Sequence, residues 1–320
     1  MTEFQIPLES LTSIKDKVVL ITGSSSGIGK ATASLCLSLG ARVIAGDINP
    51  LPDEFLQQHG SGTENEVSSS SSSSLLFEKT DVADWASIRN LFVKGIERFG
   101  GIDHVFANAG IAPRNNFLEE TFEDGACGEL LAPPNLKVLD VNLVGVIYTV
   151  RLGVYYLRQS GKEDAGKDGN PGGDQRSPGI TVTASASSFQ DFGAADYTVA
   201  KHGVLGVLRG LYADLMHVDS LEPERTRVRL NAIAPSWTAT GVVPRDVLVS
   251  MGVKVQDPEV VARSVVMLFT DSARHGEVIY SWEGRYCEIN RCEGGLLNGV
   301  SRILPSVAGE GPVMERLKGR

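Results

Sequence analysis

Short apolar runs alternate with amphipathic stretches from Lys17 onwards. The first run, VVLIT at 18–22, is rich in β-branched residues, and a glycine-rich turn and a helix-like stretch ending at Gly40 follow it. Runs of the same kind occur at 41–47, 102–110, 180–185, 228–235 and 277–282, and longer periodic stretches predict helices within roughly 134–158 and 194–218. This alternation is typical of parallel βαβ units. The pattern predicts an α/β fold with a doubly wound parallel β-sheet flanked by helices on both faces.

Four segments do not follow this pattern. Residues 1–16 are interpreted as an N-terminal extension, and residues 285–320 as an irregular C-terminal tail. The stretch 60–75 contains the serines from Ser68 to Ser74, and 161–179 is polar and glycine-rich, so both are predicted to be flexible insertions. No internal repeat is present, and the sequence therefore predicts a single domain over 17–284.

Composition and charge exclude several classes of function for this chain. Hydrophobic residues make up 42% and charged residues 22%, as in ordinary globular proteins. The net charge of -9 argues against a nucleic-acid or anionic-membrane partner, because phosphates attract a basic surface. No cysteine lies at zinc-site spacing, so we expect no metal site and reduced thiols at Cys36, Cys127, Cys287 and Cys292. The N-terminus resembles no signal peptide and no apolar run approaches the ~18 residues of a membrane helix, so we expect a cytoplasmic protein.

A glycine turn joins the first strand to the first helix. LITGSSSGIGKA places Thr22-Gly23, Gly27 and Gly29 in the spacing TGxxxGxG. Glycines let the backbone approach a pyrophosphate closely, and a helix N-terminus offers N–H donors and a positive dipole end. The alternative is a strand–helix turn without a ligand.

An acid follows this turn at the end of the second strand. Asp47 lies 20 residues beyond Gly27, where a carboxylate can accept hydrogen bonds from ribose hydroxyls. A 2′-phosphate would meet it as a like charge, and the stretch Ser24–Ser26 contains no lysine or arginine. These residues favour NAD over NADP, unless Asp47 is an ordinary loop-start aspartate.

A tyrosine and a lysine share one helix face. Tyr197 and Lys201, in YTVAK, are four residues apart. A free tyrosine has a pKa of about 10, and stabilising its phenolate to near neutrality takes about 4 kcal/mol. An ammonium about 4 Å away in a partly screened site supplies roughly that energy. The pair is a candidate base, although a surface pair with this spacing is common.

Further polar segments come directly after predicted strands or lie on the long helix. They are Asn108-Ala109-Gly110, Asn142 in LDVNLVG, TASASS at 183–188 and NAIAPSWTAT at 231–240. The carboxyl ends of parallel strands meet at one edge of the sheet, where such folds bind ligands. We therefore expect these segments to converge around Tyr197.

With these motifs in this order, the chain resembles the short-chain dehydrogenase/reductase family from about Lys17 to Gly284. The resemblance implies a single-domain Rossmann-type oxidoreductase that forms homodimers or homotetramers. It implies that Tyr197 is the acid/base, that Lys201 binds the nicotinamide ribose and lowers the tyrosine pKa, and that Asn142 holds a water behind Lys201. It assigns the pyrophosphate to Gly23, Ser26, Gly27, Ile28 and Gly29. The remaining cofactor-binding candidates are Ser25, Asp47, Asp81, Val82, Asn108, Ala109, Gly110, Pro235 and Thr240. Asp81 and Val82 match the family's adenine-contacting pair. Thr240 matches the threonine beside the nicotinamide amide.

Two positions depart from the family pattern. The position thirteen residues before the tyrosine, where the family has its catalytic serine, is Ala184. We assign the role to Ser185, which ends the predicted strand, with Ser187 as the alternative. Ser236 replaces the usual glycine after Pro235 and is expected to alter the loop over the nicotinamide.

Apolar residues near these motifs predict the substrate. Phe189, Phe192 and the segment 240–251, with Val242, Val243, Val247, Leu248 and Met251, form an apolar lid or simply pack against the core. A lid would suit a terpenoid, steroid-like or polyketide alcohol, and the insertions resemble those of filamentous-fungal members of secondary metabolism. We expect an NAD-dependent dehydrogenase of secondary alcohols. The alternatives are an NADPH-dependent ketone reductase and a non-redox dinucleotide-binding protein or isomerase.

Overall fold

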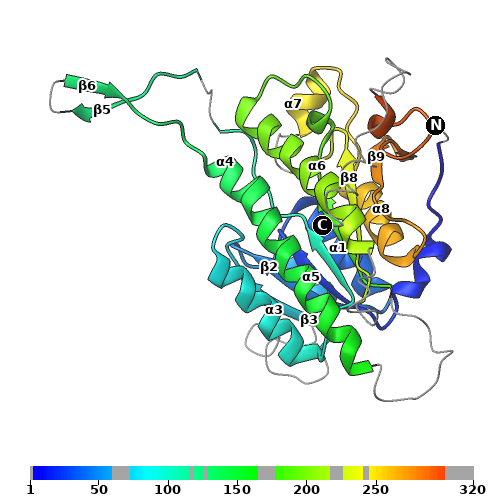
Figure 1. Cartoon of the computed structure of the whole chain (residues 1–320). Coiled ribbons are helices and arrows are strands. Elements are labelled where there is room, and N and C mark those ends of the chain that lie inside the picture. Colours follow the sequence, from blue (N-terminus) through cyan, green and yellow to red (C-terminus); the bar gives the residue numbers. More distant parts are fainter. Residues whose placement is uncertain are drawn as a thin grey trace, which may run out of the picture.

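A sheet with eight strands runs through the molecule (Figure 1). The computed structural model describes residues 3–59, 73–114, 118–125, 128–164, 177–216, 226–240 and 245–299. The strand order is β10-β9-β8-β7-β4-β1-β2-β3, and neighbours are parallel except β10, which is antiparallel to β9. The strands are β1 (Val18–Thr22), β2 (Arg42–Asp47), β3 (Leu75–Lys79), β4 (His104–Ala107), β7 (Gly179–Thr183), β8 (Arg229–Pro235), β9 (Val278–Trp282) and β10 (Arg285–Glu288).

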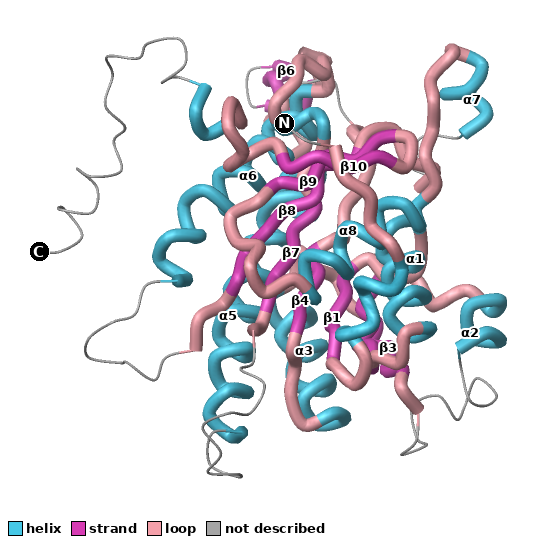
Figure 2. The backbone as a smooth tube through the Cα atoms, turned by 90° about the vertical axis from the view of Figure 1, so that its right-hand side faces the viewer, coloured by secondary structure: helices cyan, strands magenta, loops and turns pink. Residues whose placement is uncertain are grey.

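Helices cover both faces of the sheet (Figure 2). One face carries α3 (Trp85–Phe99), α5 (Gly145–Asp164) and α6 (Ala195–Met216) over a core that includes Phe92. The other carries α1 (Gly27–Ser38), α8 (Pro258–Thr270) and the 3-10 helix η1 (Leu8–Ile14) over a second core around Phe106. The short helices are α2 (Asp53–His59), α4 (Lys137–Leu139) and α7 (Arg245–Ser250), and 3-10 turns lie at Ala186–Ser188 and Leu296–Asn298. Burial on both sides explains the nearly continuous apolar runs of the strands.

The predicted fold class is confirmed, and each strand expected from the sequence is present within three residues of its predicted ends. Regular structure extends into the ends of both predicted insertions. Ser73 is buried and Leu75 begins β3, so only 60–72 of the first insertion lies outside the described residues. The helix α5 extends to Asp164 and β7 begins at Gly179, which leaves 165–176 of the second insertion outside them.

Described residues before Lys17 and after Gly284 pack on the framework, and the predicted irregular tail contains the strand β10. Leu11 and Ile14 on η1 are fully buried, and the Phe4 N–H donates to the Tyr286 carbonyl at 3.0 Å. The strand β10 continues the sheet beyond Gly284, because a tight turn brings it back against β9. Among the described cysteines, Cys36, Cys287 and Cys292 are free, and Cys127 lies outside the described residues.

Two features of the α4–α5 region matter for function. The stretch Lys137–Ser160 is long and apolar enough to cross a membrane by length and composition, but half of it is buried against the protein core, as expected of a core helix. Before it, β5 (Phe122–Gly125) and β6 (Gly128–Leu131) pair only with each other among the described strands and extend away from the body (Figure 1).

Candidate active site

A cleft of about 510 Å³ follows the carboxyl ends of the parallel strands. It is lined by segments that come directly after β1, β2, β3, β4, β7 and β8. The predicted site residues that line it are Gly23, Ser26, Gly27, Ile28, Asp47, Asp81, Val82, Asn108, Ala109, Gly110, Asn142, Ser185, Tyr197, Lys201, Pro235 and Thr240. Ser25 and Gly29 lie behind this lining. The expected convergence at one sheet edge is therefore present.

The glycine turn brings backbone close to the cleft. Gly23 adopts a φ of 70° in the left-handed region, and a side chain there would meet the Ala109 backbone at 2.8 Å. A Cβ on Gly29 would collide with the Gly23 carbonyl oxygen. Ser26 precedes α1 without a side-chain capping bond. The turn thus presents backbone and an uncapped helix N-terminus to the cleft, which is an arrangement that accepts a diphosphate.

Asp47 stands at the next strand end with its carboxylate held by backbone donors. Its Oδ2 accepts from the Ser25 N–H at 3.0 Å and its Oδ1 from the Asn49 N–H at 2.9 Å. The Ser25 hydroxyl in turn donates to the Asn49 carbonyl at 2.8 Å. Ser25 therefore does not line the cleft but helps to orient the Asp47 carboxylate, which does. An ionised carboxylate has about four acceptor positions, so further donors can bind here.

Asn108 ties three strand ends together. Its side-chain amide donates to the carbonyls of Thr22 and Gly23, and its Oδ1 accepts from the Thr183 hydroxyl at 3.2 Å. The Thr22 hydroxyl accepts from the Asn108 N–H at 3.0 Å. These bonds fix β1, β4 and β7 relative to one another beneath the cleft.

Tyr197 and Lys201 line the cleft from α6. Lys201 is buried, its Nζ lies 5.6 Å from the Tyr197 ring centre, and it donates to the Thr183 carbonyl at 2.8 Å. Burial lowers the pKa of Lys201 to about 8, because desolvation disfavours the ammonium. The lysine is thus within reach of the cleft but is directed at a strand carbonyl.

In the protein without cofactor, burial is the largest influence on the pKa of Tyr197. Burial raises the pKa of Tyr197 above its ordinary value, and only the hydrogen bond with the Ser185 side chain opposes that rise. The ammonium lies over the tyrosine ring and donates a hydrogen bond to the Thr183 carbonyl.

The two candidate serines are separated by the structure. Ser185 lines the cleft and bonds to Tyr197, and its Oγ also accepts from the Ser187 N–H at 3.2 Å. Ser187 is fully buried and does not line the cleft. The strand β7 ends at Thr183, so Ser185 begins the following 3-10 turn instead of ending the strand.

Asn142 lies in a π-helical segment, Asp140–Val144, between α4 and α5. Its Oδ1 accepts from the Ile111 N–H at 2.8 Å and its amide donates to the Ile111 carbonyl at 2.9 Å. These bonds hold the loop after Gly110 against the cleft. Single-turn π-bulges of this kind are frequent at functional sites.

The apolar lid is smaller than the sequence suggested. Leu248 lines the cleft, whereas Val247 and Met251 are exposed, and Val242 and Val243 lie outside the described residues. Phe192 lines the cleft, but Phe189 packs against Tyr280 instead.

The sequence interpretation missed Tyr280 as a lining residue, and it gave Trp237 no role of its own although the segment 231–240 was expected at the site. An aromatic residue directly after a strand carries no motif, so only its position beside Ser236 could have suggested a role.

Fold and cleft together define a dinucleotide-binding oxidoreductase of the Rossmann type. The glycines of the first turn leave room that a Cβ would fill, and Asp47 and the α1 N-terminus supply the polar groups that a nicotinamide dinucleotide requires. The residues therefore fit that cofactor.

Comparison with known proteins agrees. The family model of the short chain dehydrogenases matches residues 17–247, and the chain belongs to this family. The chain is 39% identical over 289 residues to short-chain dehydrogenase/reductase ascJ of Acremonium egyptiacum, covering 90% of this chain and 86% of that one. It is 31% identical over 270 residues to prx4 of Penicillium roqueforti, covering 83% and 69%. The crystal structure of levodione reductase superposes with a TM-score of 0.61 at 25% identity, covering 83% and 96%. The protein is thus an oxidoreductase that acts on a hydroxyl or ketone group with a nicotinamide dinucleotide.

Proposed function

We propose that the protein interconverts a secondary alcohol and a ketone on an apolar small molecule with NAD(H). The observation that carries this proposal is that Ser185 and Tyr197 line the same cleft with interacting side chains, and that the buried Lys201 lines it beside them. A phenol and a hydroxyl that face one cavity can both contact a single substrate oxygen.

Each residue would have a separate role in the reaction at that oxygen. The nicotinamide, when bound, supplies the hydride acceptor or donor. Ser185 would hold the substrate oxygen by a hydrogen bond, and Tyr197 would move its proton. Lys201 would bind the nicotinamide ribose, and Asn142 would fix the loop at Ile111 and hold the water of the proton relay.

The raised pKa of Tyr197 bears on the direction of the reaction. At neutral pH the side chain is a protonated phenol, which can donate to a carbonyl oxygen in ketone reduction. Alcohol oxidation needs the phenolate and gains as the pH rises towards the pKa of Tyr197. The same residues therefore serve both directions, with opposite pH dependence.

Asp47 supports NAD as the cofactor. None of the cationic residues that line the cleft, namely Arg114, Lys137 and Lys201, comes from the glycine turn or from the end of β2. A 2′-phosphate at this end would face Asp47 without a cation from either segment. An NADPH-dependent ketone reductase would need such a cation, and a non-redox binding protein would need no Ser185–Tyr197 pair.

The substrate is proposed to be a secondary metabolite of the terpenoid, steroid-like or polyketide kind. Phe192 and Leu248 give the cleft apolar walls, and the Phe192 ring centre lies 6.1 Å from that of Tyr197. Similarity to the proteins of Acremonium egyptiacum and Penicillium roqueforti supports a role in fungal metabolism.

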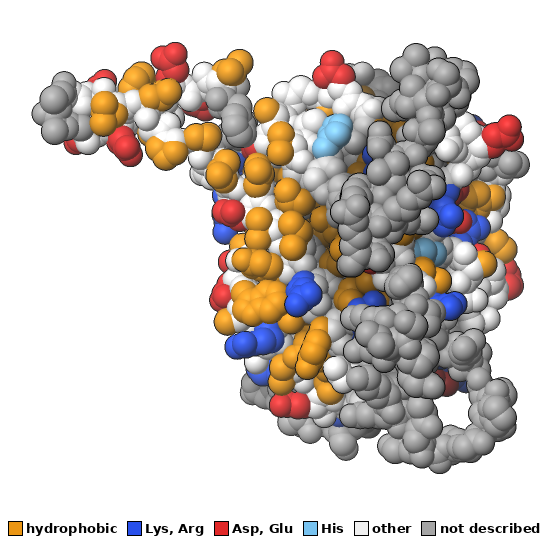
Figure 3. All heavy atoms as spheres, in the orientation of Figure 1, with side chains coloured by type: hydrophobic (Ala, Val, Ile, Leu, Met, Phe, Trp, Pro, Cys, Tyr) orange, Lys and Arg blue, Asp and Glu red, His pale blue; other side chains and the backbone are white. Residues whose placement is uncertain are grey.

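We also propose that the chain forms a homodimer or homotetramer. Hydrophobic side chains gather on the β5–β6 hairpin and along the outer face of α5 (Figure 3). They include Phe122 and Leu131 on the hairpin and Ile147 and Tyr155 on α5, all of them exposed. A two-stranded hairpin alone is marginally stable in water, so we expect a second copy to cover it. Leu131→Asp should shift sedimentation velocity profiles towards the monomer, and unchanged profiles would place the interface elsewhere.

The central test is turnover of Tyr197→Phe with NAD and a panel of apolar secondary alcohols. The phenylalanine keeps the aromatic volume and removes the proton-carrying oxygen, so NADH formation should fall by at least about a hundredfold while dinucleotide binding persists. Retention of more than about a tenth of wild-type turnover would show that Tyr197 does not move the proton. A wild type that turns over no alcohol and no ketone with either dinucleotide would refute the proposed function.

A further inference from the structure

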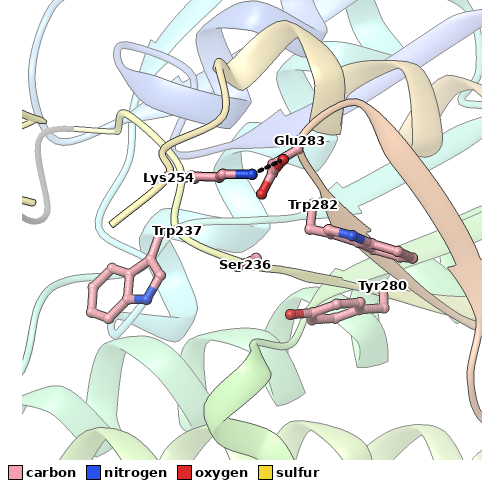
Figure 4. A pocket seen from close by; sticks show the side chains of 6 residues that line it. All are labelled: Ser236, Trp237, Lys254, Tyr280, Trp282 and Glu283. Carbon is pink, nitrogen blue, oxygen red and sulfur yellow. Dashed lines mark hydrogen bonds and ion pairs between the residues drawn. The ribbon is translucent and has the colours of Figure 1, made fainter. Parts of the chain in front are cut away.

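A second cavity adjoins the cleft and shares part of its lining. It measures about 220 Å³ and is lined by Ser236, Trp237, Lys254, Tyr280, Trp282 and Glu283 (Figure 4). We call it the aromatic chamber. Ser236, Trp237 and Tyr280 line both the chamber and the cleft, so these three residues form the wall between the two spaces.

Aromatic rings lead from the reacting end of the cleft to this chamber. The Phe192 ring lies 6.1 Å from that of Tyr197 and 5.8 Å from that of Trp237, measured between ring centres. Beyond the wall, Tyr280 and Trp282 are 5.3 Å apart and tilted by 31°. A substrate whose carbinol lies at Tyr197 would therefore extend along ring surfaces before it reaches the chamber.

The dividing wall carries two hydroxyl groups that bond to nothing within the described part of the chain. The Tyr280 hydroxyl points towards Ser236 and Trp237 in Figure 4, and neither it nor the Ser236 hydroxyl has a hydrogen-bond partner there. Ser236 is also the residue that replaces the glycine usual after Pro235. Two unpaired hydroxyls beside aromatic rings suit a polar substituent on a planar ring.

An ion pair lines the far side of the chamber. Lys254 Nζ lies 3.0 Å from the Glu283 carboxylate, across the cavity from Tyr280 (Figure 4). Glu283 has a φ of 47° in the turn between β9 and β10, a strained conformation for a residue with a side chain. The Arg285 guanidinium lies 5.0 Å from the centre of the Trp282 ring and forms a cation–π contact with that ring. The paired charges give this wall no preference for an anion, so the chamber suits a neutral group.

We propose that the aromatic chamber binds the distal end of the substrate and selects a neutral, planar aromatic group that carries a hydroxyl or carbonyl oxygen. The proposal rests on the proposed function, because the reacting carbinol must lie at Tyr197, and among the substrate classes proposed there it favours an aromatic polyketide over a saturated terpenoid or steroid. A saturated distal group would lose the ring-to-ring contacts, and a group without an oxygen would leave the hydroxyls of Ser236 and Tyr280 unpaired.

The test uses secondary alcohols with one reacting group and distal ends that differ. Each alcohol ends in a hydroxyphenyl, phenyl or cyclohexyl ring on a linker of varied length, and a short alkanol without a ring serves as the reference. The wild type should show the highest kcat/KM for a hydroxyphenyl alcohol. Tyr280→Phe should reduce the preference for hydroxyphenyl over phenyl by several-fold, because it removes only a hydroxyl. Trp282→Leu should reduce the preference for phenyl over cyclohexyl by up to about tenfold.

Trp85→Leu is the matched control. Trp85 begins α3 and lines neither cavity, so the same substitution there should leave every ratio unchanged. The short alkanol should react equally with wild type and Trp282→Leu, since it does not reach the chamber. Equal losses for all alcohols, or unchanged ring preferences, would overturn the chamber proposal while turnover of the alkanol upholds the proposed function.

A binding measurement tests the chamber even if the protein turns over none of these alcohols. If no alcohol reacts with either dinucleotide, calorimetry of the hydroxyphenyl alcohol with dinucleotide-loaded wild type and Trp282→Leu still tests the chamber. Weaker binding to the variant, by several-fold or more, would support it, and equal or undetectable binding to both would refute it.

Discussion

Neutralising Asp47 and adding a cation beside it should reverse the choice of cofactor. The change is Asp47→Asn with Ile48→Arg. Asparagine keeps an acceptor for one of the two backbone N–H groups that Asp47 now binds, those of Ser25 and Asn49, and so spares the turn. The Ile48 side chain is 55% exposed, which leaves room for a guanidinium that can grip a phosphate by two parallel bonds.

The expected size of the preference for NAD over NADP follows from the charge on the Asp47 carboxylate. Hydrogen bonds from ribose hydroxyls to an ionised group contribute about 1.5–3 kcal/mol. A phosphate about 4 Å away would instead be repelled by about 4 kcal/mol per unit charge in a partly screened site. Since each 1.36 kcal/mol is a factor of ten, wild type should prefer NAD by at least about a hundredfold in kcat/KM. The double variant should lose most of that preference or invert it.

The assay is kcat/KM for both dinucleotides with one fixed alcohol. Asp81→Asn is the matched control, because Asp81 also lines the cleft but follows β3 and holds the Ala83 N–H at 2.9 Å. It should affect both cofactors alike. A wild type that favours NADP, or a ratio that moves with Asp81 and not with Asp47, would refute the assignment of Asp47 and the case for NAD.

Two further predictions concern the reacting end of the cleft. Ser185→Ala should lose at least about tenfold in kcat, whereas Ser187→Ala, buried behind the lining, should lose little activity, and equal losses in steady-state assays would contradict the assignment. Oxidation should accelerate with rising pH, because Tyr197 reacts as the phenolate and its pKa is raised, while reduction should slow. The buried Lys201, whose pKa is lowered to about 8, is half deprotonated near that pH, so dinucleotide affinity should weaken as the pH rises through this value. Parallel pH profiles in both directions would show that another group governs the proton.

The sequence alone determined the framework and most of the lining of the cleft. The apolar runs before Gly23, Asp47 and Asn108 could be recognised because buried parallel strands are apolar along their whole length. Motif spacing then placed Tyr197 and Lys201 on one helix face. The strand β3 escaped notice because its end, Glu78-Lys79, is polar and the serine tract precedes it. The strand β10 escaped notice because its pairing depends on a turn and on a partner strand, not on an apolar pattern.

Only the tertiary structure decided the electrostatics and the shape of the substrate end. The sequence gives the spacing between Tyr197 and Lys201 but not the direction of the ammonium, which is set by the Thr183 carbonyl on a strand 18 residues earlier. Burial depends on how the two layers of helices close over the sheet, so the rise in the tyrosine pKa could not be derived from spacing. Trp237 follows β8 and Tyr280 lies within β9, and they form one wall because β8 and β9 are neighbours in the sheet.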